Sequence, residues 1–145
     1  MTKETDALRD LYTTLIDSRD GYEQAAEIVD SPKLQNLFED MRGRRAQHAA
    51  EVRGFLASSE SDLDDDGTIL AAAHRQFLGL KDMLSSDDEE VVEEVIRGER
   101  TLMEAYDKAI VPMDANSPAY TFANKQYDNV KARIAELEEI ERQLD

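Results

Sequence analysis

The sequence predicts an all-α protein, a four-helix bundle with one long crossover connection in the middle of the chain. Two observations predict this fold. Apolar residues recur every three or four positions through four long segments, which is the spacing of one helix face. Only three prolines and six glycines interrupt the chain, whereas good helix formers such as Ala, Leu, Glu and Arg are abundant.

The first two expected helices form a hairpin. The first runs from about Thr5 to Asp30, where the stretch "DSPKL" ends it. Ser31 can cap the next helix, and Pro32 falls in its first turn, where no backbone N–H is needed. This second helix ends near Leu56. The two apolar stripes consist of Leu8, Leu11, Leu15, Tyr22, Ala25 and Val29, and then of Leu34, Leu37, Met41, Val52 and Phe55.

The second half repeats this plan after the crossover, in which a short fifth helix is expected from about Thr68 to Leu84. Ser86 and Glu89 have the spacing of a capping box for a long helix that ends near Val111. A Ser-Pro pair at 117–118 then starts the last helix. The apolar stripes of these two long helices consist of Val92, Val95, Leu102, Tyr106 and Ala109, and then of Tyr127, Val130, Ile134, Leu137 and Leu144.

The lengths of the connections predict the directions of the helices. Short turns make each pair an antiparallel hairpin, whereas a crossover of about 30 residues can run the length of the bundle and leave the two helices that it joins parallel. This is the connection found in ferritin-like bundles. We therefore expect residues 1–145 to form a single ferritin-like helical bundle domain, with a weak internal duplication of its hairpins.

Composition and charge narrow the classes of partner. The formal net charge is −16, which repels nucleic acid and anionic membranes, so neither is expected as a partner. Cysteine is absent, which excludes disulfides, thiolate metal sites and cysteine nucleophiles. No apolar run approaches the ~20 residues of a membrane span, and the first residues lack the apolar core of a signal peptide. A cytoplasmic protein that associates with itself or with another protein is expected.

Polar residues interrupt the apolar stripes near the middle of three helices. The first helix offers Ser18 or Arg19 to the interior, and the second offers Arg44 or Arg45. His48 follows on the second helix, and Glu99 interrupts the stripe of the fourth helix in the series. Antiparallel packing would bring these positions to one level of the bundle, which predicts a polar layer at its waist.

The waist of a four-helix bundle is where di-iron proteins hold their metals, with a Glu from each of two helices and Glu-x-x-His from each of the other two. Candidate ligands here are Glu23 (or Asp20), His48, Glu51 and Glu99. Arg45 stands where the Glu of the motif would be, and the last helix has no histidine, so at most half of a site is present. The sequence therefore predicts either that the protein has no cofactor or, as the alternative, that it binds iron.

The alternative reading of the waist is a structural ion pair. A guanidinium cannot bind a metal or lose its charge at ordinary pH, and a buried carboxylate requires a counter-charge. We expect Glu99 to face inward and to pair with Arg45 or Arg19, and no catalytic residues are assigned.

An acidic stretch, Asp62 to Ala73, resembles the first half of a calcium loop. Asp62, Asp64 and Asp66 alternate and Gly67 follows, but Ala73 stands where such a loop needs a bidentate Glu. We therefore expect no selective calcium binding, and the aspartates are read as the acidic entrance to a helix. His74 is read as a packed or surface residue.

Four stretches together resemble a bacterial family of unknown function with ferritin-like four-helix bundles: "DSRDGYEQAAE", "RRAQHAAEV", "AHRQFLGLKDML" and "VIRGERTLMEAYDKAI". The resemblance covers about Leu8 to Ile110 and implies a ferritin-like fold and stress-related expression in bacteria. It implies no catalytic residues. The function expected is therefore a non-enzymatic bundle that acts by association, and the alternative is a carboxylate-rich protein with a degenerate site that binds or oxidises iron.

Overall fold

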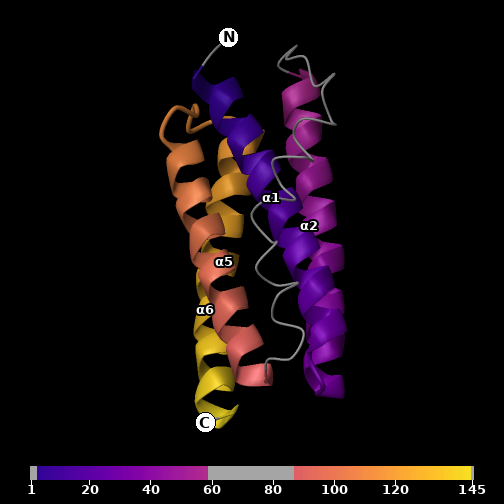
Figure 1. Ribbon diagram of the computed structural model, residues 1–145. Helices are drawn as coiled ribbons and strands as arrows, with labels where there is room; N and C mark the ends of the chain where they lie inside the picture. The colour runs from indigo at the N-terminus through magenta and orange to yellow at the C-terminus, as the bar shows by residue number, and fades with distance from the viewer. Residues whose placement is uncertain (1–2, 59–86, 145) are drawn as a thin grey trace.

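The computed structural model describes residues 3–58 and 87–144, which form four α-helices (Figure 1). These helices are α1 (Lys3–Ile28), α2 (Pro32–Ser58), α5 (Asp88–Ile110) and α6 (Pro118–Leu144). Every regular element in the two described ranges is helical, so the predicted all-α four-helix bundle is confirmed there. The expected short helix at Thr68–Leu84, the Asp62–Ala73 stretch and His74 lie outside the described residues.

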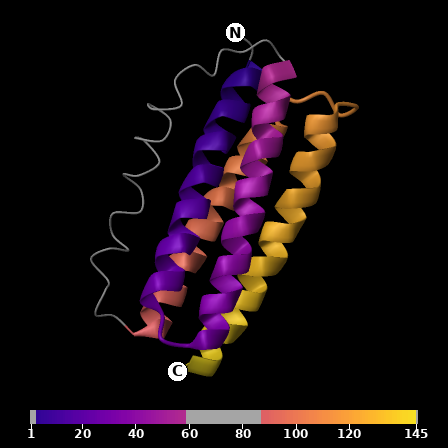
Figure 2. The ribbon, with the colours of Figure 1, turned by 90° about the vertical axis from the view of Figure 1, so that its right-hand side faces the viewer.

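The four helices form two antiparallel hairpins. In Figure 1, α1 runs downward from the end that holds the N-terminus, and α2 runs back upward. The helix α5 also runs upward, parallel to α2, and α6 runs downward beside α5. The helix α1 packs against both α2 and α5, and α6 packs against α5. Consequently α2 and α5, which are parallel, lie diagonally across the bundle, with α2 nearest the viewer and α5 behind it in Figure 2.

The start of α5 is bound to the turn between α1 and α2. The Asp88 carboxylate accepts a hydrogen bond from the Asp30 N–H at 2.8 Å and another from the Ser31 N–H at 3.0 Å. Since α2 ends at Ser58, one helix length away from this turn, the crossover joins opposite ends of the bundle.

The N-terminus of α5 differs in one detail from the sequence-based expectation. Asp87, in extended backbone geometry, is the N-cap, and its carboxylate accepts from the Glu90 N–H at 2.9 Å. The predicted capping box began one residue earlier, at Ser86. A carboxylate is as good an N-cap acceptor as a hydroxyl, and it also adds a negative charge at the positive end of the helix dipole.

One continuous apolar core runs along the bundle and receives side chains from all four helices. Leu11, Phe38, Leu102 and Leu137, one from each helix, are wholly buried. No helix among the described residues is both long enough and apolar enough to cross a membrane.

Candidate functional site

Arg45 is the charged side chain that α2 places at the waist of the bundle. It lies one helical turn after Met41 and one before Ala49, and both of these neighbours are buried, so the helix turns all three inward. Arg45 is 2% exposed, and Glu99 of α5 is equally buried at 2%. The interior therefore holds a full positive and a full negative charge.

The two charged groups meet in a bidentate ion pair across the diagonal of the bundle. Arg45 Nη2 donates to Glu99 Oε2 at 2.8 Å, and Arg45 Nη1 donates to Glu99 Oε1. Nη1 also donates to the Ser18 hydroxyl of α1 at 2.9 Å. Both carboxylate oxygens are thus occupied by one guanidinium, the geometry in which such pairs are strongest.

An aromatic ring lies against the pair. The guanidinium carbon of Arg45 lies 5.5 Å from the centre of the Tyr22 ring, within the range of a cation–π contact. Burial would lower the pKa of Arg45, but the attraction of Glu99 outweighs it and the pKa of Arg45 is raised. Burial, and then the negative charge of Glu99, raise the pKa of Tyr22 well above its ordinary value. Arg45 is charged and Tyr22 is neutral throughout the working pH range.

The other candidate residues make no hydrogen bond or ion pair with Arg45 or Glu99 among the described residues. Arg19 is partly exposed and pairs with its neighbour Asp20 at 2.9 Å. Glu23 and Glu51 are exposed to solvent. His48 is half-buried, and its ring meets that of Phe122 edge-on, with 5.9 Å between the ring centres. Of the polar positions in α1, Ser18 is the one that reaches the waist.

The residues at the waist do not fit an iron site. Both oxygens of Glu99 already accept hydrogen bonds from Arg45, and a cation placed between them would meet the guanidinium. Within residues 3–58 and 87–144 no group of three or more His, Asp or Glu side chains is arranged to hold a metal ion. Glu23 and Glu51 would have to leave the solvent to approach Glu99.

One unusual buried acid was missed by sequence reasoning. Asp17 of α1 is 1% exposed, and neither of its carboxylate oxygens has a hydrogen-bond partner within the part of the chain that the structure describes. Burial, with a smaller contribution from the charge of Asp20, raises the pKa of Asp17 to about 7. The apolar spacing of α1 gives no signal for this, because Asp17 lies off the stripe that Leu15 and Tyr22 define.

These features define a class of protein, an all-α four-helix bundle whose waist is closed by a buried Arg–Glu pair. Residues 3–111 match the family model described as a domain of unknown function, DUF2383, and the chain belongs to this family. The match includes α1, α2 and α5, and hence both members of the pair, and ends before α6 begins. Comparisons with curated proteins and with solved structures find no match.

Proposed function

We propose that this chain is a non-enzymatic, ferritin-like bundle that acts through association with a second copy of itself. The observation that carries the proposal is the Arg45–Glu99 pair, which occupies the level where ferritin-like enzymes hold their metals. Glu99 has its counter-charge within the chain, so it requires no cation. Because this ion pair fills the level at which a metal would bind, we infer that the protein acts through its surface.

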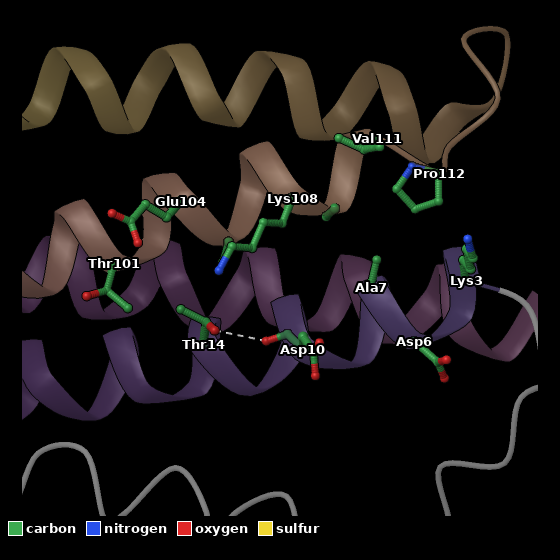
Figure 3. A pocket seen from close by; sticks show the side chains of 12 residues that line it. Lys3, Asp6, Ala7, Asp10, Thr14, Thr101, Glu104, Lys108, Val111 and Pro112 are labelled. Atoms are coloured by element: carbon green, nitrogen blue, oxygen red, sulfur yellow. Dashed lines mark hydrogen bonds between the residues drawn. The ribbon is translucent and has the colours of Figure 1, made fainter.

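A groove between α1 and α5 supports association as the mode of action (Figure 3). Its apolar lining comes from Ala7 on α1, from Ala105 and Ala109 on α5, and from Val111 and Pro112 just beyond α5. Val111 is 83% exposed, and among the described residues it is the most exposed of the large apolar side chains. An apolar patch with a charged rim is typical of an association surface.

The rim of this groove carries both signs of charge. Lys3 and Lys108 are basic, and Asp6, Asp10 and Glu104 are acidic; Figure 3 shows these side chains on facing stretches of α1 and α5. In a two-fold dimer a residue away from the axis meets a different residue of the other copy, so a patch of mixed sign can pair with itself. This argument favours a second copy of the chain over a uniformly basic partner.

Sedimentation equilibrium tests the proposal. We expect the wild-type chain to form a dimer that Val111→Asp weakens, because the substitution places a charge in the apolar contact. Ala135→Asp is the matched control, since Ala135 is exposed on α6 away from the groove and gains the same charge. A monomeric wild-type chain, or equal weakening by both variants, would contradict self-association through this groove.

The competing function, iron binding or oxidation, has its own test. We expect the chain, mixed with ferrous ion without oxygen and then exposed to air, to hold no stoichiometric iron and to consume no oxygen. Two ions per chain with oxygen uptake would replace the proposed function with the enzymatic one.

A further inference from the structure

A second groove, between α2 and α6, is lined by more basic than acidic side chains. Its volume is about 590 Å³, and its lining is mainly polar. Arg44, Arg45 and His48 contribute to it from α2, and Lys125 and Arg133 from α6. In a chain with a net charge of −16, this gathering of basic side chains stands out.

The charges in the groove are only partly compensated. Arg44 pairs with Asp40 at 3.0 Å, and Arg133 donates to both carboxylate oxygens of Glu136 at 3.0 Å. Lys125 has no ion-pair partner among the described residues. Exposed ion pairs contribute little, and the Arg44 side chain is 58% exposed, so Arg44 can turn from Asp40 to a bound anion.

The positive charges of the groove act on the imidazole of His48. Burial, followed by the positive charges of Arg45, Arg44 and Lys125, lowers the pKa of His48 from 6.5 to about 4. Glu136 also lines the groove, but the neighbouring charges that lower the pKa of His48 are those of Arg45, Arg44 and Lys125. His48 is therefore neutral at pH 7, with one ring nitrogen that can donate a hydrogen bond and one that can accept.

A buried donor of Arg45 is left unpaired beside this groove. Arg45 is 2% exposed and lines the groove, and its two terminal nitrogens serve Glu99 and Ser18. Its Nε–H, by contrast, is buried and has no hydrogen-bond acceptor among residues 3–58 and 87–144. Buried donors normally have a partner, so this N–H is an unsatisfied donor on a residue that lines the groove.

We propose that the groove between α2 and α6 binds the phosphate group of a small anionic molecule. A carboxylate has two oxygens, whereas a phosphate presents three or more and carries up to two charges at neutral pH. The guanidinium of Arg44, the ammonium of Lys125 and the imidazole N–H of His48 supply donors of the kinds that bind phosphate. The volume exceeds that of phosphate alone and leaves space for an attached organic group.

Calorimetry with inorganic phosphate at pH 7 and low salt tests this site. We expect one phosphate per wild-type chain. Lys125→Gln should weaken binding about tenfold, because it removes a charged hydrogen-bond donor. Lys131→Gln is the matched control, since Lys131 is an exposed lysine on the same helix that does not line the groove. This variant should bind as the wild type does, and acetate should bind far more weakly than phosphate.

NMR of the imidazole supplies a second readout. His74→Gln leaves His48 as the one histidine in the chain, which the sequence shows to have two. Phosphate bound beside this ring should raise the pKa of His48 from about 4, because a nearby negative charge favours the imidazolium. The absence of binding heat with an unchanged His48 titration would overturn the proposal. Equal weakening by the two lysine variants, or equal binding of acetate, would overturn it as well.

Discussion

Arg45 and Glu99 are each almost wholly withdrawn from water, so each depends on the other to compensate its charge. We expect Arg45→Ala to lower the free energy of unfolding by about 3–5 kcal/mol in urea titrations, because Glu99 is left buried and unpaired. Replacing both residues by Met should recover most of this loss, since neither charge is then stranded.

The control for this prediction is an ion pair at the surface. Arg97 donates to Glu94 within α5, and the Arg97 side chain is 66% exposed. Arg97→Ala should therefore change the free energy of unfolding by less than about 1 kcal/mol. Similar losses for Arg45→Ala and Arg97→Ala would show that burial of the waist pair has no special weight.

Asp17 and His48 give opposite contributions to the pH dependence of stability. Folding raises the pKa of Asp17 from 3.8 to about 7, so the folded state holds a proton that the unfolded state has lost, and stability falls as pH rises through this interval. Folding lowers the pKa of His48 from 6.5 to about 4, so stability falls instead as pH drops through that interval.

Single variants should separate these two effects in thermal unfolding measured against pH. Asp17→Asn should gain stability over the wild type progressively as pH rises from 3.8 to about 7, the interval in which the carboxyl is ionised in the unfolded state but still protonated in the folded state. His48→Gln should gain relative to the wild type as pH falls below 6.5. If the difference between Asp17→Asn and the wild type does not change with pH, Asp17 is ionised in both states and its pKa is not raised.

At the scale of the helices, Asp88 holds the two hairpins together at one end. Its carboxylate accepts from two backbone N–H groups in the turn between α1 and α2, although it belongs to α5. We expect Asp88→Ala to destabilise the fold by about 1–3 kcal/mol, because hydrogen bonds to a charged group are lost. Asp88→Asn, which keeps one acceptor oxygen, should lose less. Chemical denaturation of the two variants makes this comparison, and an equal effect would contradict it.

The helices themselves were largely predictable from local chemistry. Pro32 and Pro118 begin α2 and α6 as the two Ser-Pro pairs predicted, because proline suits only the first turn of a helix. The apolar spacing also identified Glu99 and the Arg44–Arg45 turn as the interruptions of the stripes. Spacing alone could not choose between Arg44 and Arg45, or between Ser18 and Arg19, because adjacent residues differ by only 100° around a helix.

Features made by two helices at once were not predictable in this way. The basic groove joins Arg44 and His48 of α2 to Lys125 of α6, which is far from them in the sequence and which no pattern on α6 singled out. The hydrogen bonds of Asp88 depend on how the hairpins meet, and the burial of Asp17 has no counterpart in the periodicity of α1. Such features arise from the packing of one helix against another, and the spacing of residues along a single helix carries little information about that packing.

For the whole molecule, the net charge of −16 is the dominant long-range term. Like charges on a compact chain repel one another, and added salt screens this repulsion over about 10 Å at 0.1 M. We expect the melting temperature to rise as sodium chloride is added from low ionic strength. The buried waist pair is screened little, so a falling melting temperature would mean that favourable surface ion pairs outweigh the net repulsion.

The diagonal placement of Arg45 and Glu99 has a consequence for alignment during folding. Each hairpin can close through its own short turn, and apolar stripes alone would tolerate a slip of one hairpin along the other. A slip of one helical turn, about 5.4 Å, would separate the guanidinium from the carboxylate and leave both without a partner inside the bundle. The pair therefore fixes the alignment of the two hairpins along the bundle axis. A misaligned docking that apolar contacts alone would tolerate is disfavoured because it leaves both charges buried and unpaired.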